Sequence, residues 1–281
     1  MPSRTKNQLI VTADDLGLHP GMTLGAIRAH REGIVTACSV SANGRALAHA
    51  LESIQDCPNL DAGVHLTLVE EVPLSAAADV PSLVTAGGTF HRNFAVFAGR
   101  YFAGAIRITE VERELRAQIE LLLARGLSLV HANGHQHLHI LGKVFELVLS
   151  LAEEYGIRYV RIPYEAAPKR SVRGAGLAAM NRFANSSRAR AAGRVLTNDR
   201  TIGIAQAGHL DAASVVSLIP KVHGLTELVC HPGVGGVAIA AEYKWGYAWD
   251  TETDALCDPA VKAALTDAHI ELVGVSAASA S

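Results

Sequence analysis

The hydrophobic residues of this chain occur in short runs rich in β-branched side chains, and stretches with helical spacing lie between these runs. Runs of this kind are typical of strands in βα units, which build a parallel sheet rather than a sandwich or a helical bundle. The candidate strands are residues 8–13, 36–42, 61–69, 128–135, 157–163, 200–206, 226–231 and 271–276. We therefore expect an α/β fold with a parallel sheet.

The clearest helix is expected to begin at Thr109, where the sequence T-E-V-E offers an N-cap and a glutamate three positions later. Apolar residues follow at helical spacing, and Gly126 is expected to end the helix. Two segments interrupt the alternation, at about 70–108 and 164–198, and we interpret them as insertions that shape a substrate cleft. We expect 281 residues to form a single domain, 1–281, of a size ordinary for an α/β barrel.

Composition narrows the classes of partner. The formal net charge is -2, so the chain lacks the basic field of a nucleic-acid-binding protein. No apolar stretch approaches the roughly 20 residues of a membrane span, and the N-terminal apolar run is too short for a signal peptide. A cytoplasmic location is therefore expected. Four widely spaced cysteines form no CxxC pair and are expected to be reduced thiols: Cys38, Cys57, Cys230 and Cys257.

The segment 166–198 is locally basic. It contains no acidic residue, and its basic residues are Lys169, Arg170, Arg173, Arg182, Arg188, Arg190 and Arg194. Two interpretations remain open. The segment is either a solvated or mobile flap, or a surface for an anionic or membrane-borne substrate.

Several predicted strands end in residues that are capable of chemistry, as in barrels whose active site lies at the carboxyl ends of the strands. These residues are Asp14, Asp15, Ser41, Asn43, His65, His135, Arg161 and His231. Although they come from distant parts of the sequence, they could converge on one mouth of a barrel. The sequence thus predicts a site there.

Asp14 and Asp15 directly follow a buried strand, where two carboxylates repel each other and lose solvation unless a cation or hydrogen bonds relieve them. A metal ion is the simplest relief. Because neighbouring strand residues point to opposite faces, one carboxylate would bind the ion and the other would stand nearby as a base. The alternative is a solvated turn, in which an aspartate caps a helix that begins near Pro20.

Histidines suggest further ligands, each with a structural alternative. His65 lies among apolar residues in GVHLTL, where it is either a ligand or a core histidine with satisfied ring nitrogens. The run HANGHQHLH carries His131, His135, His137 and His139, and the last three share a face if the strand extends that far. This density of imidazoles favours zinc or a related divalent ion, although polar loops also contain it.

Further positions could contact the substrate or orient a ligand. His231 ends a strand before a Pro-Gly turn and is a candidate general acid. Arg161 and Glu165, in RIPYE, form either an ion pair that orients a ligand or a plain surface pair. The aromatic segment YKWGYAWD includes Trp245. It either packs against a sugar ring or seals the core.

Six segments together resemble the YdjC-like carbohydrate deacetylases, also called the ChbG family: VTADDLGL, GIVTACSVSANG, GVHLTL, HANGHQHLH, RIP and ELVCHPG. They occur in order over nearly the whole chain. The tail WGYAWDTETDALCDP is similar to the HpnK-like branch associated with hopanoid biosynthesis. The resemblance implies a TIM-barrel-like (β/α) fold and removal of an acetyl group from an N-acetylated amino sugar.

The resemblance also implies a division of roles. It assigns metal ligands to Asp15, His65 and His135, the general base to Asp14 and the general acid to His231. His137 and His139 would then orient a ligand or be structural, and Asn43 would lie near the substrate. The implied cofactor is one divalent ion, magnesium or zinc, with manganese and cobalt as alternatives.

The chain departs from the family pattern at two positions. Asn133 stands two residues before the ligand histidine, where the family usually has an aspartate, and Leu16 replaces a usual phenylalanine. The loss of the carboxylate is predicted to change metal affinity or the pH optimum, but it removes no ligand.

Two other functions fit the same residues. A metal-dependent phosphoesterase would suit the basic segment, but such sites often carry two metal ions. A sugar-binding module with a structural metal would hold a full ligand set with no exchangeable water. For the deacetylase, the expected substrate is a chitooligosaccharide, another amino sugar or a glycolipid such as a glycosylated hopanoid. Peripheral membrane contact and a homodimer are open alternatives.

Overall fold

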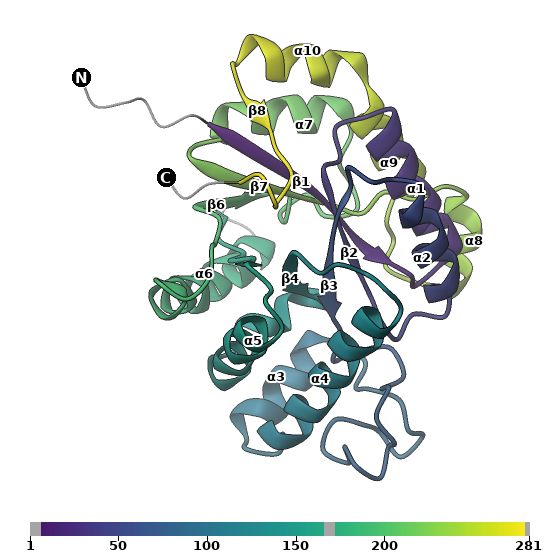
Figure 1. The fold of residues 1–281 in the computed structure, drawn as a ribbon, viewed down its shortest axis with the longest axis vertical. Helices are drawn as coiled ribbons and strands as arrows, with labels where there is room; N and C mark the ends of the chain where they lie inside the picture. The colour runs from purple at the N-terminus through teal and green to yellow at the C-terminus, as the bar shows by residue number, and fades with distance from the viewer. Residues whose placement is uncertain (1–6, 166–171, 279–281) are drawn as a thin grey trace.

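A curled sheet of parallel strands occupies the centre of the molecule, and helices surround it (Figure 1). The computed structural model describes residues 7–165 and 172–278, except for the side chains of 172–177 and 179. Lys169 and Arg170 of the basic segment therefore lie outside the described residues. The α/β, TIM-barrel-like architecture expected from the sequence is confirmed. Within the described ranges, no helix combines the length and apolar character that crossing a membrane requires.

Over the described residues the sheet contains eight strands, all paired in parallel. They are β1 (Gln8–Leu16), β2 (Ala37–Val40), β3 (Asp61–Leu66), β4 (His131–Gly134), β5 (Tyr159–Val160), β6 (Arg200–Ile202), β7 (Leu225–Cys230) and β8 (Glu271–Leu272). Their order is β5-β4-β3-β2-β1-β7-β6, and β8 pairs with β1. All eight coincide with predicted runs, because each run is bounded by helical or turn-forming sequence.

The gap between the edge strands β5 and β6 is bridged by the side chain of Asn198. Its amide accepts a hydrogen bond from Ile162 N at 2.8 Å and donates to Ile162 O at 2.9 Å and Arg200 O at 2.8 Å. Nearby, Leu196 forms an isolated parallel bridge with Tyr159. Asn198 is fully buried. Its amide thus supplies bonds that a neighbouring strand would otherwise provide.

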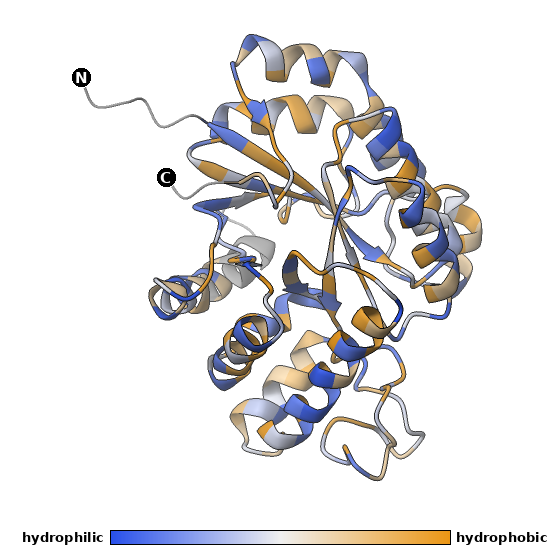
Figure 2. Ribbon diagram, in the orientation of Figure 1, coloured by the Kyte–Doolittle hydropathy of each residue, from blue (hydrophilic) through white to orange (hydrophobic). Residues whose placement is uncertain are grey.

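Helices and helical turns connect the strands and cover the outer face of the sheet (Figure 1). They are α1 (Pro20–Arg31), α2 (Leu47–Gln55), α3 (Phe94–Phe102), α4 (Ile108–Ala124), η1 (His135–Ile140), α5 (Gly142–Glu154), α6 (Val172–Ala191), α7 (Ala212–Leu218), η2 (Ile219–Lys221), α8 (Gly236–Glu242), α9 (Trp249–Cys257) and α10 (Pro259–Asp267). Hydrophobic residues run along much of β1, whereas β4 is largely hydrophilic (Figure 2). Because the helices bury their apolar sides against the strands, the main core lies between the two.

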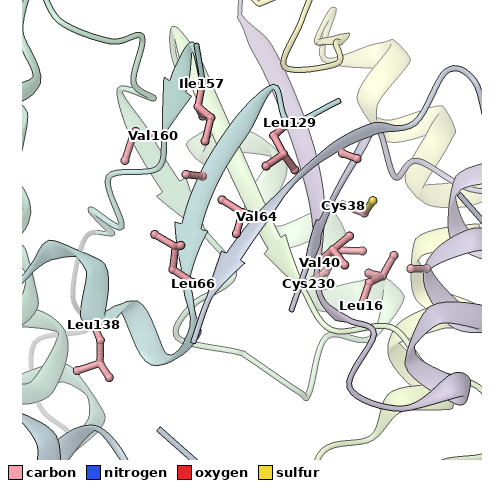
Figure 3. Packing of buried hydrophobic residues seen from close by; sticks show 14 of the residues in the cluster. Leu16, Cys38, Val40, Val64, Leu66, Leu129, Leu138, Ile157, Val160 and Cys230 are labelled. Carbon is pink, nitrogen blue, oxygen red and sulfur yellow. The ribbon is translucent and has the colours of Figure 1, made fainter. Parts of the chain in front are cut away.

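Along β1, successive side chains enter two different environments. Leu9, Val11 and Ala13 belong to the main core between strands and helices, part of which is drawn in Figure 3. Ile10 instead packs in a small cluster inside the curled sheet. Asp14 lies on the same inner side, because side chains alternate along a strand. The polar residues of this inner side are shielded from water and therefore need partners.

The starts of two helices differ from the sequence prediction. α4 begins one residue before Thr109, with Arg107 at the N-cap position and no side-chain cap. The predicted capping box is therefore wrong, although Gly126 does follow the helix in a left-handed conformation, with φ of 84°. At α1 the cap is His19, whose Nδ1 accepts a hydrogen bond from Gly21 N. This cap excludes the alternative in which an aspartate caps α1.

Buried carboxylates of α4 anchor the first predicted insertion, 70–108. Glu114 is fully buried and accepts hydrogen bonds from Leu74 N at 3.0 Å and from the next backbone N–H. Glu110 accepts one from Ser82 N at 2.6 Å. These bonds tie the loop to the first turns of α4.

Two arginines of the basic segment, Arg190 near the end of α6 and Arg194 just after it, have acidic neighbours in α5. Arg190 pairs with Glu146 at 3.4 Å, and Arg194 pairs with Glu146 and Glu153 at 3.2 and 2.6 Å. Arg188 donates instead to the backbone oxygens of 198 and 199. Much of the described basic charge in this segment is therefore offset by a neighbouring helix. The four cysteines are free thiols.

We predict that Gly25→Ala destabilises the fold. A Cβ at Gly25, on the buried side of α1, would lie 2.4 Å from the backbone of Gly233, so the helix and the turn after β7 must separate. Overpacking of this kind costs about 1–3 kcal/mol. Urea unfolding should show the loss in the free energy of unfolding.

Gly99→Ala is the matched control, because Gly99 is also helical but a Cβ added to it would meet no atom within 4 Å. Its unfolding midpoint should stay constant or rise, since alanine favours helix. Equal midpoints for Gly25→Ala and the unchanged protein would contradict this packing.

Candidate metal centre and catalytic pocket

The end of β1 departs from regular strand geometry at the two aspartates. The register with β2 shifts between Ala13 and Leu16, and Asp15 has φ of 70°, a conformation uncommon outside glycine. Gly17 follows with φ of 89°. Because this bulge interrupts the alternation of side chains, Asp14 and Asp15 both line the same pocket. Both side chains are buried.

Asp15, His65 and His135 converge at this pocket. Asp15 Oδ1 lies 3.1 Å from His65 Nε2 and 3.0 Å from His135 Nδ1, and the two ring nitrogens are 3.3 Å apart. Three donors bound at about 2.1 Å to one tetrahedral ion lie about 3.4 Å apart. The observed spacing therefore fits a single divalent ion. Among the described residues, this is the one such group of three potential ligands.

Each of these imidazoles makes a hydrogen bond through its other nitrogen. His65 Nδ1–H donates to Asn133 Oδ1 at 2.6 Å, and His135 Nε2–H donates to Glu70 Oε2 at 3.1 Å. In the neutral ring, this places the lone pair on the nitrogen that faces Asp15. Burial lowers the pKa of His135, but Asp15 and Glu70 outweigh it and raise that pKa to about 10. Metal binding would therefore release a proton.

Asn133, which departs from the family pattern, makes two contacts that an aspartate could not make together. Its Oδ1 accepts from His65, and its Nδ2 donates to Asp14 Oδ1 at 3.0 Å. A carboxylate here would face Asp14 with no proton to donate, so the two groups would repel each other. The amide instead joins the ligand histidine to the neighbouring acid.

Asp14 is held by a buried guanidinium. Arg161 Nη1 donates to Asp14 Oδ2 at 2.5 Å and Nη2 to Oδ1 at 2.9 Å, while Nε donates to Glu227 Oε1 at 2.9 Å. Ser39 also donates to Asp14 Oδ1, at 2.8 Å. Burial alone would raise the pKa of Asp14, but Arg161 holds it well below its ordinary value. Asp14 is therefore ionised at neutral pH.

The predicted ion pair between Arg161 and Glu165 is wrong. Arg161 is fully buried between Asp14 and Glu227. Glu165 accepts a hydrogen bond from Ala205 N at 2.9 Å and lines a separate cavity of about 250 Å³. β5 ends at residue 160, before the end of the predicted run 157–163, so Arg161 and Glu165 both lie beyond the strand.

The buried charges around the site do not balance by themselves. Asp14, Asp15 and Glu227 contribute three negative charges and Arg161 contributes one positive charge. One negative charge therefore remains in excess while His135 is protonated, and two remain when the histidines are neutral, as metal binding requires. Isolated charge of this kind is costly in a protein interior unless it is paired. A divalent cation beside neutral histidines would cancel this charge, which is a second sign that the donor set fits a metal.

His231 faces the same pocket from the end of β7. Its Nδ1 finds no hydrogen-bond partner among the described residues, and Glu252 Oε1 lies 3.9 Å away while accepting from His231 N at 2.6 Å. Burial lowers the pKa of His231 and raises that of Glu252 to about 8. The ring of Tyr247 packs edge-on against His231, with centroids 5.2 Å apart. Imidazole is the side chain whose ordinary pKa lies nearest to neutral pH, and burial shifts His231 toward its neutral form.

These groups line one cavity of about 200 Å³. Its lining residues are Asp14, Asp15, His65, Gly134, His135, Gln136, His137, Ile204, Ala207, Val229, His231 and Tyr247. The structure therefore brings together all five residues to which the resemblance assigned a role, and adds His137.

His135, His137 and His139 do not share one strand face, because the strand does not extend as far as that expectation required. β4 ends at Gly134, and the chain enters η1 with left-handed φ values of 50° at Gln136 and 57° at His137. His139 is turned away from the pocket, and its Nε2–H donates to the backbone oxygen of residue 161 at 2.9 Å. The tight turn at Gln136 and His137 keeps His135 in the pocket lining, while the residues after it no longer follow the direction of β4.

Two other predicted residues lie outside the pocket. Asn43 donates to Val72 O at 3.1 Å and thus holds the loop after β3. Trp245 packs behind His135, with centroids 5.4 Å apart, and its Nε1–H donates to Glu70 Oε2 at 3.0 Å. Trp245 lines a second cavity of about 350 Å³ together with Arg45, Glu70, Glu71, Glu242, Tyr243 and Lys244.

Comparison with known proteins identifies the family. The sequence profile of the YdjC-like protein family matches residues 8–267. The chain belongs to the YdjC-like protein family. The carbohydrate deacetylase of Geobacillus stearothermophilus is 34% identical over 266 residues, which cover 94% of this chain and 95% of that protein. The carbohydrate deacetylase of Brevibacillus brevis is 40% identical, but the match covers 56% of this chain and 60% of that protein. The chain thus spans less than two thirds of that relative.

A solved structure supports the same assignment. It is described as a candidate cellobiose-phosphate cleavage protein from Enterococcus faecalis V583. It has a TM-score of 0.76 and 26% identity, and the alignment covers 96% of this chain and 98% of that one. The YdjC-like family and the barrel-like fold expected from the sequence are therefore both confirmed.

In this YdjC-like chain, several residues of the site escaped sequence reasoning. They are Ser39, Glu70, Glu227 and Glu252. Glu227 carried a readable signal, because a charged residue within the apolar run TELVC is rarely buried without a partner. Glu70 and Glu252 carried none, since each lies in a loop or helix whose position relative to the site depends on the tertiary fold.

We predict that Glu252→Gln changes how the stability of this YdjC-like chain depends on pH. Burial raises the pKa of Glu252 from 4.5 to about 8. The contribution of its protonated carboxyl is therefore fully present below pH 4.5 and is lost as pH rises to about 8. Glutamine keeps an acceptor for His231 N but does not ionise, so the free energy of unfolding should fall less between pH 5 and pH 8.

Urea unfolding at the two pH values measures the difference. Glu52→Gln, on the exposed side of α2, is the control and should follow the unchanged protein. If Glu252→Gln loses as much stability on going to pH 8 as the control does, the buried carboxyl is not the titrating group.

Proposed function

We propose that this chain is a metal-dependent deacetylase that hydrolyses the acetamide of an N-acetylated amino sugar to acetate and a free amine. The observation that carries the proposal is the meeting of three donor atoms with an ionised Asp14 and with His231 in one small pocket. The names of the relatives, carbohydrate deacetylases, support this class of substrate. We also propose that residues 1–281 act as one domain.

Asp15, His65 and His135 would hold one divalent ion. Two imidazoles favour zinc, while magnesium, manganese and cobalt are further candidates. When bound at such a site, a divalent ion supplies Lewis acidity toward a carbonyl oxygen and lowers the pKa of water. A set of three protein ligands suits this purpose, because catalytic sites keep a coordination position open.

Asp14 is the proposed general base. Its Oδ1 accepts hydrogen bonds from Ser39, Asn133 and Arg161, whereas Arg161 is the donor to Oδ2. Oδ2 therefore keeps a lone pair for the proton of a water molecule in the pocket. As Asp14 takes this proton, the water oxygen forms a bond to the acetamide carbon. The two bonds from Arg161 fix the direction of the carboxylate during the transfer.

His231 is the proposed general acid. It lines the pocket at the end of β7, which β1 and β2 separate from β3 and β4 in the sheet. A proton from its imidazole would pass to the amine nitrogen as the carbon–nitrogen bond breaks. Glu252 binds the backbone N–H of His231 and lies behind the ring, so the position of the imidazole is fixed.

The pocket of about 200 Å³ has room for the acetamido group of such a substrate. Ile204, Ala207 and Val229 supply apolar surface for the acetyl methyl, and Tyr247 supplies an aromatic face for the sugar ring. The remainder of the substrate would extend outward. N-acetylglucosamine oligosaccharides and glycolipids, including a glycosylated hopanoid, are the proposed substrates.

A phosphoesterase is less well supported. Among the described residues a single group of three potential ligands is found, whereas phosphoesterases of this kind often use two metal ions. Arg190 and Arg194, two of the arginines that suggested phosphate binding, are paired with Glu146 and Glu153.

Metal removal is predicted to abolish acetate release from N-acetylglucosamine oligosaccharides, and added zinc or magnesium should restore it. His135→Ala should lower kcat/KM by roughly 100-fold or more, because several kcal/mol of charge stabilisation would be lost with the ion. The assay is enzymatic detection of acetate. His30→Gln is the control, because His30 is at the end of α1 that points away from the site. Full turnover in chelator-treated protein would exclude the metal mechanism.

Asp14→Asn is predicted to retain the metal and to lose about 100- to 10,000-fold in kcat, the range for a missing general base. Asparagine still accepts hydrogen bonds from Arg161 through Oδ1 but takes up no proton. Acetate release and metal content should be measured on the same preparation. Should the variant keep full kcat with one metal bound, another group must be the base.

A further inference from the structure

We propose that Glu70 is a positioning residue: it fixes the ring of His135 in the orientation and tautomer that a metal ligand needs, and Trp245 and Gln136 hold Glu70 in place. This inference rests on the metal site of the proposed function. Glu70 lies in the segment interpreted from the sequence as an insertion, and it reaches the site only because the loop after β3 folds over η1.

The contacts of Glu70 use both of its carboxylate oxygens. Oε2 accepts from His135 Nε2–H at 3.1 Å and from Trp245 Nε1–H at 3.0 Å, and Oε1 accepts from Gln136 Nε2 at 3.0 Å. Three donors from two distant segments thus determine the plane of the carboxylate. An imidazole ligand whose second nitrogen donates to an oriented carboxylate has a fixed tautomer and ring angle.

The backbone conformations of Glu70 and Gln136 are ones that residues other than glycine seldom adopt, so surrounding contacts must maintain them. Glu70 has φ of 70° and Gln136 has φ of 50°, both in the left-handed region. Residues of this kind persist where surrounding contacts determine them, and they concentrate at functional sites. The hydrogen bond from Gln136 to Glu70 joins the two left-handed residues directly, and Glu70 N donates to His91 O at 2.9 Å.

The two ligand histidines have acceptors of different charge. His65 donates to the neutral amide of Asn133, whereas His135 donates to the carboxylate of Glu70. A charged acceptor attracts the Nε2 proton more strongly and raises the electron density at Nδ1, the nitrogen that faces Asp15. Glu70 therefore makes His135 a stronger electron-pair donor to the metal ion than His65.

The test measures the affinity of the protein for Zn²⁺ alone, by competition with a chromophoric chelator and without substrate. Glu70→Ala is expected to bind Zn²⁺ about 10- to 100-fold more weakly, the usual effect of losing such a partner. Glu70→Gln keeps an acceptor oxygen for His135 and should recover part of this loss. Glu242→Gln is the matched control: it removes a carboxylate from the same cavity, is 48% exposed and should leave the affinity unchanged.

A second measurement distinguishes a specific effect on the His135 ring from a general loss of order at the site. In the Zn²⁺-loaded protein, the ¹⁵N signals of the His135 imidazole should show a proton on Nε2. In Glu70→Ala this proton should exchange faster with water and its nitrogen should shift, while the signals of His65 should not. Unchanged Zn²⁺ affinity and unchanged His135 signals in Glu70→Ala would overturn the inference.

Failure of the proposed function has a different signature. A protein that binds Zn²⁺ through Glu70 and His135 as described, but releases no acetate from any N-acetylated sugar, retains this inference and loses the deacetylase. Conversely, a protein with deacetylase activity whose Zn²⁺ affinity falls in His135→Ala but not in Glu70→Ala retains the function and loses the inference.

Discussion

Arg161 lies between two carboxylates inside the curled sheet, and the rest of the site depends on this contact. A guanidinium with no exposure to solvent is tolerated only beside ionised partners, here Asp14 and Glu227. Glu227 is fixed in turn by hydroxyl groups of Thr12 and Tyr159, at 2.6 and 2.7 Å. The strands that form the fold are thus joined by the same charges that keep Asp14 ionised. The contacts of Arg161 with Asp14 and Glu227 therefore contribute both to the stability of the fold and to the ionised state of Asp14.

The sequence predicted the positions of the strands and the residues at their ends well. Apolar runs bounded by turns mark strands through local chemistry, so Asp14, Asp15, His65 and His231 could be placed at one edge of the sheet without knowledge of distant contacts. The family resemblance then selected His135 from a run of four histidines. Spacing alone pointed to a shared strand face, which η1 does not provide.

The remaining features depend on contacts between distant parts of the chain. Arg161 was assigned to Glu165 because they are close in sequence, yet its partners lie 66 and 147 positions away. The amide of Asn198, which bridges the edge strands, has no signature in the pattern of hydrophobic positions. Glu70 likewise acquires its neighbours only when the loop after β3 folds over η1. The local sequence pattern therefore identifies the candidate metal ligands and acid–base residues, but it misses most of the residues that position them.

The left-handed residues of this chain are concentrated at the site. Outside glycine, the described residues include five with positive φ, and four of them surround the ligands: Asp15, Glu70, Gln136 and His137. Glycine or asparagine would adopt these conformations more easily. Selection for thermal tolerance alone would therefore tend to replace the residues on which the proposed reaction depends. In such a scaffold, the most stable sequence and the most active sequence are different targets, and natural variation at these four positions reports which of the two has been maintained.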